Sequence, residues 1–382
     1  MKTELLYDSD SHICRFFANV VSCEKKDGFY DAVLDKTAFF PGGGGQKRDE
    51  GKIGSAALTD MYTENGRVHH ILDSAVFGEV ECVLDYPLRF SRMQNHSGEH
   101  LFSGIIHNAT GFENVGFHMG NEFMTIDFSG EIDKELIYSC ELRANEAIYK
   151  NIPVKISYPD ENELSGLSYR SKKELSGDIR IVEIPGIDVC ACCAPHVMNT
   201  GEIGIIKVLG FMRHRGGTRI FLTCGSSAFF DYVSKNDSVK KIGELTSSKP
   251  EEVLSAVNCL LEQNRAVNQE LYEANKKYID CVLKTAEKNE KSICLYFSGL
   301  GYDLLRYAAT ELLKLTSKAA VALSEKPEGG YAFVCASKTL DLKAVTADLR
   351  SALNARGGGK STMTEGSINA SKEDIDSFFN AL

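Results

Sequence analysis

The stretch that decides the fold is residues 95–100, which read Asn-His-Ser-Gly-Glu-His. Residues four apart on a helix are neighbours on one face, so this stretch offers two imidazoles side by side. A second stretch, residues 192–196, reads Cys-Cys-Ala-Pro-His and adds a thiolate and a third imidazole. Three nitrogens and one sulfur form a tetrahedral set that suits Zn²⁺. Together the two stretches predict a zinc site whose ligands are His96, His100, Cys192 and His196.

The number of ligands raises a question about the role of this site. Four protein ligands are typical of structural zinc, whereas catalytic zinc usually keeps an open position. We therefore expect a displaceable ligand, five-coordination, or a separate group that activates water. Glu99 on the same predicted helix is the candidate general base, and its alternative is a solvated glutamate on the helix surface. Cys190 and Cys193 are rival thiolates that spacing does not rank against Cys192.

Residues 96–100 also fit the H-x-x-E-H pattern of inverted zinc proteases. Such enzymes need a downstream carboxylate as third ligand, whereas the downstream candidates here are Cys192 and His196. A zinc peptidase is therefore the minor alternative.

The composition bounds the class of protein. A chain of 382 residues is expected to form about two or three domains. Its net charge of −10 argues against broad non-specific nucleic-acid binding, although it allows a local basic groove. The chain has no long apolar run and no signal-peptide core, so we expect no membrane segment. Its 12 cysteines then predict reduced thiols and a cytoplasmic location.

Hydrophobic patterning predicts a multidomain α+β protein. Residues 1–86 show short, glycine-bounded strand patterns. Residues 87–225 alternate helix and strand patterns, with a long helix that opens at Pro87 and stops near Gly111. Residues 291–382 predict a small α/β domain.

Residues 226–290 predict a helical arm. Apolar side chains recur there with 4-3 spacing over four heptads, and Asn264 is the most polar member of the seam. This pattern predicts a coiled-coil hairpin or a dimer, and the alternative is an amphipathic helix that packs on its own domain.

Several motifs resemble one known family. Residues 92–103 resemble the first zinc motif of alanyl-tRNA editing domains, and residues 192–204 resemble the second. The glycine-rich residues 40–46 resemble the loop of the β-barrel that precedes such domains. Residues 213–220 resemble the strand that closes the editing domain. The order of these motifs, followed by the coiled coil and a Gly-Gly-Gly motif, is similar to that of long-form, free-standing AlaX-type alanyl-tRNA editing proteins.

The resemblance implies a trans-editing hydrolase that deacylates tRNA(Ala) mischarged with serine, and it leaves glycine open. It also implies an N-terminal β-barrel over 1–86 and the four zinc ligands above. The heptad pattern adds a homodimer through the coiled coil and C-terminal domain as the expected assembly. No room is left upstream of the barrel for a charging domain, so aminoacylation is not expected. The usual Gly-Gly-Thr of the second motif is Cys193-Ala194-Pro195 here. A tRNA-binding module without catalysis is the alternative.

Editing also requires a group that senses the serine hydroxyl, since a site built to bond a hydroxyl strongly rejects an analogue that lacks it. Thr125 is the first candidate, followed by Ser97 and Gln46. Recognition of tRNA must come from local basic features. Two segments are candidates. The first contains Arg213, Arg215 and Arg219. The second, which is expected to be a turn, contains Gly357, Gly358, Gly359 and Lys360.

Overall fold

The computed structural model describes residues 2–120, 123–171 and 179–382. The chain divides into two compact units, Met1–Val239 and Lys240–Leu382. The predicted multidomain α+β architecture is confirmed. No helix in the described ranges is both long enough and apolar enough to cross a bilayer.

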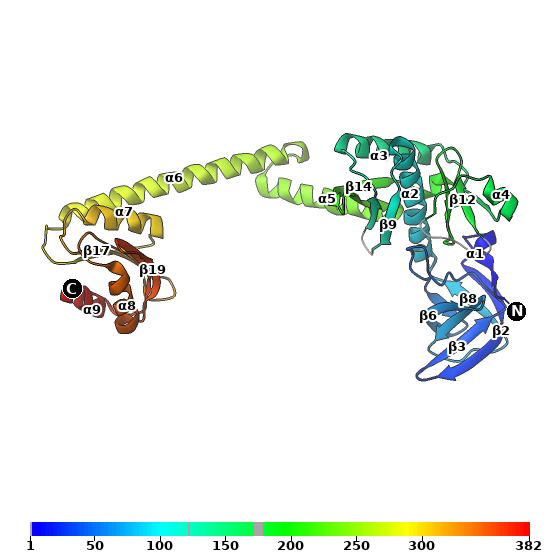
Figure 1. Cartoon of the computed structure of the whole chain (residues 1–382), viewed down its shortest axis with the longest axis horizontal. Helices are drawn as coiled ribbons and strands as arrows, with labels where there is room; N and C mark the ends of the chain where they lie inside the picture. The colour runs from blue at the N-terminus through cyan, green and yellow to red at the C-terminus, as the bar shows by residue number, and fades with distance from the viewer. Residues whose placement is uncertain (1, 121–122, 172–178) are drawn as a thin grey trace. The chain divides into compact units, whose positions relative to one another are not determined.

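The first unit begins with a small β-barrel (Figure 1). A short strand β1 (Glu4–Leu5) pairs with β4 (Lys36–Thr37), and helix α1 (Leu6–Ser9) follows β1. Alternate side chains of strands such as β7 and β8 point into an apolar core. Six strands close the barrel, in the order β2 (Arg15–Lys26), β3 (Phe29–Leu34), β7 (Arg67–Leu72), β6 (Ala56–Glu64), β5 (Gly51–Ile53) and β8 (Glu79–Leu84).

Helix α2 (Tyr86–Thr110) leads out of the barrel into the α+β part of the unit (Figure 1). The side chain of Asp85 caps its first turn, and Gly111 ends it in a left-handed conformation at φ 72°, as expected from the sequence. Every residue from Met93 to Ile106 is buried. Because this stretch includes several polar and ionisable side chains, their partners must lie inside the protein.

Two sheets surround α2. One is antiparallel, in the order β14 (Ile206–His214), β15 (Gly217–Cys224), β10 (Met124–Phe128) and β9 (Asn114–Met119). The other contains β11 (Lys155–Ser157), β12 (Ile181–Ile184) and β13 (Asp188–Ala191). Helix α3 (Lys134–Tyr149) packs on α2, and the remaining short helices are α4 (Glu161–Ser165) and the 3₁₀ helix η1 (Thr200–Ile203). The second motif begins directly after β13 and includes η1, and both of these elements contact α2.

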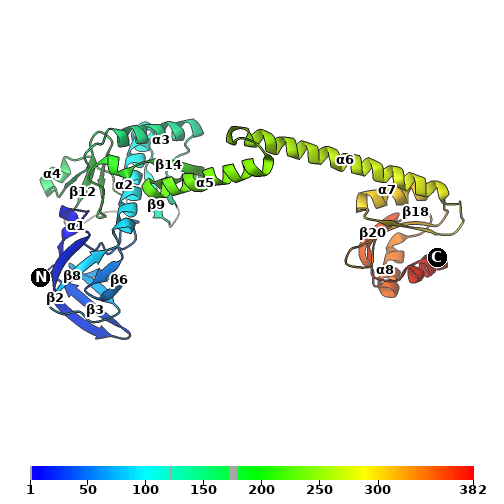
Figure 2. The same cartoon turned by 180° about the vertical axis from the view of Figure 1, so that it is seen from behind.

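Helix α5 (Gly225–Thr246) contains the division between the units. In the second unit a short 3₁₀ helix η2 (Pro250–Glu252) precedes the long helix α6 (Val253–Thr285). A five-stranded sheet follows, in the order β16 (Ile293–Ser298), β17 (Ala319–Glu325), β18 (Tyr331–Ser337), β20 (Met363–Ile368) and β19 (Arg356–Lys360). Figure 2 shows α7 (Tyr302–Leu312) beside α6. These two helices cover one face of the sheet, while α8 (Leu342–Leu353) and α9 (Lys372–Ala381) cover the other.

One local expectation is wrong. The segment Arg356–Lys360 is an edge strand and not a turn. Its glycines allow a close approach to β20, because a Cβ atom on Gly357 would lie 2.1 Å from the carbonyl oxygen of Glu365 and one on Gly359 would lie 2.2 Å from that of Met363.

Candidate metal centre

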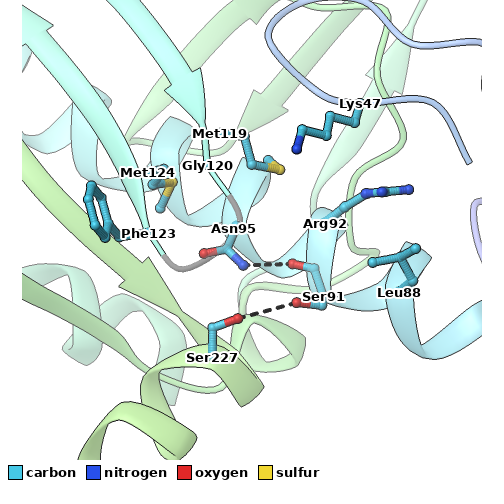
Figure 3. A pocket seen from close by; sticks show the side chains of 10 residues that line it. All are labelled: Lys47, Leu88, Ser91, Arg92, Asn95, Met119, Gly120, Phe123, Met124 and Ser227. Atoms are coloured by element: carbon cyan, nitrogen blue, oxygen red, sulfur yellow. Dashed lines mark hydrogen bonds between the residues drawn. The ribbon is translucent and has the colours of Figure 1, made fainter.

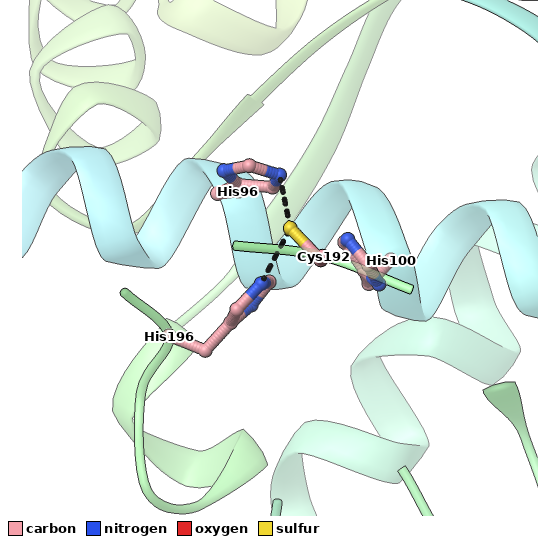
Figure 4. A group of neighbouring side chains, drawn as sticks. All are labelled: His96, His100, Cys192 and His196. Carbon is pink, nitrogen blue, oxygen red and sulfur yellow. Dashed lines mark hydrogen bonds between the residues drawn. The ribbon is translucent and has the colours of Figure 1, made fainter. Parts of the chain in front are cut away.

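Four side chains from the two motifs converge in the first unit. His96 and His100 project from α2, and the segment after β13 brings Cys192 and His196 against them (Figure 4). Their possible ligand atoms all lie within 4.8 Å of one another. The Cys192 Sγ atom is 3.6 Å from Nε2 of His96 and 3.4 Å from Nε2 of His196.

Each imidazole is oriented by a hydrogen bond at its Nδ1 atom. Nδ1 of His96 is 2.9 Å from Gln46 Oε1, Nδ1 of His100 is 3.1 Å from Asp188 Oδ2, and Nδ1 of His196 is 3.0 Å from Ser97 Oγ. These bonds leave the three Nε2 atoms to face the thiol. Metal-binding histidines are commonly held in this way by a partner on the second nitrogen. The donor set and its supporting bonds therefore fit a metal ion.

The electrostatics of the cluster favour a thiolate. Burial alone would raise the pKa of the Cys192 thiol, but its interactions with the surrounding imidazoles, hydrogen bonds among them, hold that pKa well below its usual range. Burial lowers the pKa of His196 to about 3, so this ring is neutral. A thiolate and a neutral imidazole are the forms that bind metals.

Neither rival cysteine groups with all three histidines. Cys190 is buried and groups with His100 and Asp188. Cys193 is exposed, and its Sγ atom would be 3.5 Å from a Cβ atom on Gly43. Cys192 is thus the cysteine that groups with all three histidines.

The glycine-rich loop covers the cluster. A Cβ atom on Gly44 would lie 3.9 Å from Cε1 of His96, and one on Gly45 would lie 2.4 Å from the ring of Phe117. Both glycines have positive φ, at 60° and 88°. Larger residues would therefore be strained and crowded here. This arrangement supports the interpretation of the loop as a close-approach backbone.

A buried ion pair holds the base of this loop. Arg89 and Asp49 are each 1% exposed. Arg89 Nε donates to both carboxylate oxygens of Asp49, at 2.8 and 2.9 Å. Asp49 in turn accepts a 2.7 Å bond from the amide of Phe40, so the pair joins the two ends of the loop. Arg89 also donates to the carbonyl of Ser11, whose hydroxyl donates to the carbonyl of His196.

Glu99 is buried and does not lie on a solvated helix surface. Its Oε1 atom accepts hydrogen bonds from Ser103 Oγ at 2.8 Å and from Asn114 Nδ2 at 2.5 Å. Its Oε2 atom lies 3.8 Å from Nε2 of His100. The carboxylate is therefore fixed beside a ligand nitrogen.

The three candidates for sensing a hydroxyl are placed differently. Met124, Ile126 and Phe128 of β10 point into the core shared with α2. Because side chains alternate along a strand, Thr125 points to the opposite face of the sheet. The Ser97 hydroxyl already bonds His196 and accepts from the amide of Val197 at 3.1 Å. Gln46 Nε2 is buried and, within the described part of the chain, has no hydrogen-bond partner.

The first basic segment forms one hairpin. Arg213 on β14 is 84% exposed at its side chain and pairs with Glu131 at 2.9 Å. Arg215 lies in the turn with φ 48°. Arg219 on β15 donates two bonds to Asp127, at 2.6 and 2.7 Å, which lower the pKa of that carboxyl. The second basic segment, Gly357 to Lys360, belongs to the edge strand β19 of the other unit.

Several supporting residues could not be found from the sequence. Asp188 holds His100 and is itself held by Arg170 Nε at 2.7 Å. Arg180 donates to the carbonyls of Cys192 and Ala194, at 2.8 and 2.9 Å. No local spacing marks these residues. The group around His96 is completed by a thiolate and an imidazole and not by a carboxylate, which disfavours the peptidase pattern.

The chain is similar to several known proteins. Residues 179–240 match the model of the threonyl and alanyl tRNA synthetase second additional domain. The chain is 26% identical to the alanyl-tRNA editing protein AlaX-L of Pyrococcus horikoshii, over 97% of this chain and 96% of that protein. It is 27% identical to the alanyl-tRNA editing protein Aarsd1-B of Xenopus laevis, over 63% of this chain and 60% of that protein.

The chain is also similar to complete alanine–tRNA ligases, but the similarity covers a smaller share of the ligase. The chain is 28% identical to the alanine–tRNA ligase of Methanococcus vannielii, over 98% of this chain but only 43% of the ligase. The chain is therefore similar over nearly its whole length to an AlaX-type alanyl-tRNA editing protein, as the paired motifs predict.

Proposed function

We propose that the protein is an aminoacyl-tRNA deacylase that hydrolyses tRNA(Ala) mischarged with serine, and with glycine as a second substrate. The observation that carries this proposal is the convergence of three Nε2 atoms on the Cys192 thiolate, with every Nδ1 atom held by a partner. Similarity to AlaX-L over nearly the whole chain supports the substrate class. The protein would act in the cytoplasm and without charging tRNA itself.

We propose Zn²⁺ as the metal, because a ligand set of three nitrogens and one sulfur suits it. Held by His96, His100, Cys192 and His196, the ion would supply a Lewis acid beside the ester. Glu99 is proposed as the general base, because its buried carboxylate lies beside His100, with Oε2 3.8 Å from Nε2 of that ring.

Selectivity for serine requires a donor or acceptor at the substrate side chain. We assign this role to Gln46 rather than to Thr125. His96 binds Gln46 through Oε1, so the amide nitrogen Nε2 remains as a buried donor next to a metal ligand. A hydroxyl that accepts from this nitrogen removes the cost of leaving it unpaired, whereas the methyl group of alanine does not.

For tRNA itself we propose two contact regions. Arg213, Arg215 and Arg219 lie on the hairpin of the first unit, and the exposed strand of Gly357, Gly358, Gly359 and Lys360 lies in the second. Exposed cations and a glycine backbone suit phosphate contacts, which position an RNA without reading its sequence.

We further propose that α6 forms a coiled coil with a second copy of the chain. Leu260, Val267 and Leu271 of the predicted seam are 51%, 61% and 57% exposed in one copy. A row of exposed apolar side chains at heptad spacing is the surface that such pairing covers.

The substitution His96→Ala tests the enzymatic role. We expect it to abolish hydrolysis of Ser-tRNA(Ala) while tRNA binding, measured by filter retention, is retained. Unchanged hydrolysis by the variant would overturn the metal-dependent mechanism. Binding without hydrolysis by the unaltered protein would identify it as a tRNA-binding module.

A further inference from the structure

Two of the four metal-binding side chains come from a segment with no regular structure. Residues 192–198, which contain Cys192 and His196, belong to no helix or strand. The part from Ala194 to Val197 is nevertheless buried. A buried backbone that lacks the hydrogen-bond ladder of a sheet or helix must find other partners for its polar groups. The position of these two ligands therefore depends on side chains from elsewhere in the fold.

Two buried side chains bind the carbonyl groups of this segment. Arg180 Nη1 donates to the carbonyl of Cys192 at 2.8 Å and to that of Ala194 at 2.9 Å. The Ser11 hydroxyl donates to the carbonyl of His196 at 2.6 Å. Arg180 and Ser11 are only 6% and 4% exposed. Hydrogen bonds thus hold the backbone of both metal ligands in this segment.

Both of these interactions lead back to the start of the chain. Residues 7–12 cover the end of α1 and the turn that follows it, and we call them the N-terminal segment. Within it, Asp8 Oδ1 lies 3.2 Å from Nε of Arg180. Ser11 is itself held, because its carbonyl accepts a bond from Nη1 of the buried Arg89 at 3.1 Å. The N-terminal segment therefore acts on Cys192 through Arg180 and on His196 directly.

The N-terminal segment also contacts the middle and the far end of the metal-binding stretch. The ring of Tyr7 belongs to a small apolar cluster that includes the fully buried Ala194. His12 Nε2 lies 2.9 Å from Oε2 of Glu202. The other oxygen of Glu202 accepts a bond from the amide of Asn199 at 3.1 Å, at the start of η1. The contacts are thus spread along the whole stretch from residue 192 to residue 202.

From these contacts we propose that the N-terminal segment is a positioning element of the metal centre, in which Asp8 and Ser11 set the placement of Cys192 and His196. A ligand backbone that is fixed before the ion arrives loses less conformational freedom on binding, so the ion is held more tightly. The inference rests on the proposed function in one respect, which is that the four side chains bind a metal ion.

The position of a neighbouring cavity separates effects on the metal from effects on its surroundings. Figure 3 shows this cavity, which has a volume of about 220 Å³ and begins at Arg92, one helical turn before His96. Its described lining residues are Lys47 and residues of α2, the β9–β10 hairpin and α5, so residues 7–12 lie outside it. Substitutions in the N-terminal segment should therefore alter the metal centre while the walls of this cavity stay unchanged.

The variants Ser11→Ala and Asp8→Ala test the proposal. Zinc affinity is measured by competition with a chromogenic chelator, and the absorption spectrum of Co²⁺-substituted protein reports the ligand geometry. We expect each variant to bind zinc roughly 10-fold more weakly, as for loss of an outer-shell partner, and to show an altered Co²⁺ spectrum. In deacylation of Ser-tRNA(Ala), kcat should fall while KM stays about the same. Asp8→Glu, which keeps the carboxylate, should restore most of the affinity.

Ser9→Ala is the matched control, because the Ser9 hydroxyl bonds the carbonyl of Leu6 within α1. Affinities are compared between metal-free proteins whose circular dichroism matches that of the unaltered protein, so that every measurement concerns folded protein. Unchanged zinc affinity in both Ser11→Ala and Asp8→Ala would overturn the positioning role alone. An equal loss in Ser9→Ala would overturn it as well. Failure of the unaltered protein to bind zinc would instead remove the proposed function, and the inference with it.

Discussion

At the scale of single residues, Cys192 shows how neighbours decide chemistry. The chain has three cysteines within four positions, and only the three-dimensional placement distinguishes them. Cys192 lies among three imidazoles, Cys190 lies next to Asp188, and Cys193 is exposed. The sequence motif was sufficient to propose four ligands, but the contacts that orient them come from residues up to 99 positions away, as for His196 and Ser97.

The cysteine assignment predicts different outcomes for two substitutions. Cys192→Ser removes the thiolate, and we expect zinc affinity to fall by more than the roughly 10- to 100-fold that loss of an outer-shell partner costs. Cys193→Ser should retain zinc. Elemental analysis of both variants after dialysis checks this, and zinc loss from Cys193→Ser alone would reverse the assignment.

Gln46 provides a second residue-level prediction. Gln46→Leu removes the acceptor for His96 Nδ1 and the proposed donor to serine. We expect roughly 10- to 100-fold weaker zinc binding and, at saturating zinc, a smaller ratio of Ser-tRNA(Ala) to Ala-tRNA(Ala) hydrolysis. If the ratio is unchanged at full zinc occupancy, Gln46 does not sense the hydroxyl.

His70 in the barrel predicts a pH effect away from the metal. Burial lowers its pKa to about 4, against roughly 6.5 in an unfolded chain. The unfolded state therefore binds a proton that the folded state excludes, so stability falls as pH decreases from about 6.5 to 4, by about 3 kcal/mol in total. Urea unfolding at pH 7 and pH 5 should show a smaller difference for His70→Phe than for the unaltered protein. Equal differences would contradict this assignment.

At the scale of helices and strands, local sequence signals were enough to predict some elements, whereas others depended on tertiary contacts. Helix α2 was predictable because Pro87 and Gly111 mark its ends, and the strands β16, β17 and β18 were predictable from their apolar runs. The direction of the Thr125 side chain was not predictable. Alternation along the strand defines two faces, but only the packing of β10 on α2 decides which face points inward. The edge strand β19 was missed because glycine has a low strand preference, and only its approach to β20 explains it.

The base of the glycine-rich loop gives an element-level prediction. Arg89→Met leaves Asp49 as a buried, unpaired carboxylate, which typically costs about 3–5 kcal/mol. Arg15→Ala is the matched control, because its pair with Glu81 is exposed and should cost about 1 kcal/mol or less. Urea unfolding of the two variants measures both costs. A loss for Arg89→Met no larger than that for Arg15→Ala would show that the pair does not hold the loop.

At the scale of the whole molecule, the chain combines a barrel and a candidate metal centre in one unit with a long helix and a three-layer domain in the other. The sequence motifs predicted both kinds of domain. Heptad spacing identified the apolar side of α6, but a pattern within one chain does not specify what covers that side.

The proposed coiled coil predicts that the protein is a dimer. Replacing Leu260 and Leu271 together by lysine should convert it to a monomer, because like charges would face each other in the seam. Sedimentation equilibrium measures this change, and zinc content should stay constant since both residues lie in the second unit. A monomer before substitution would rule out the dimer.

The most direct test of the central claim is the rate of deacylation of Ser-tRNA(Ala) and Ala-tRNA(Ala) as zinc is removed by a chelator and then restored. A metal-dependent editing site predicts rapid hydrolysis of Ser-tRNA(Ala), little hydrolysis of Ala-tRNA(Ala), loss of the first activity with the metal, and its return with zinc. Comparable rates on both substrates, or hydrolysis that persists in the metal-free protein, would contradict it.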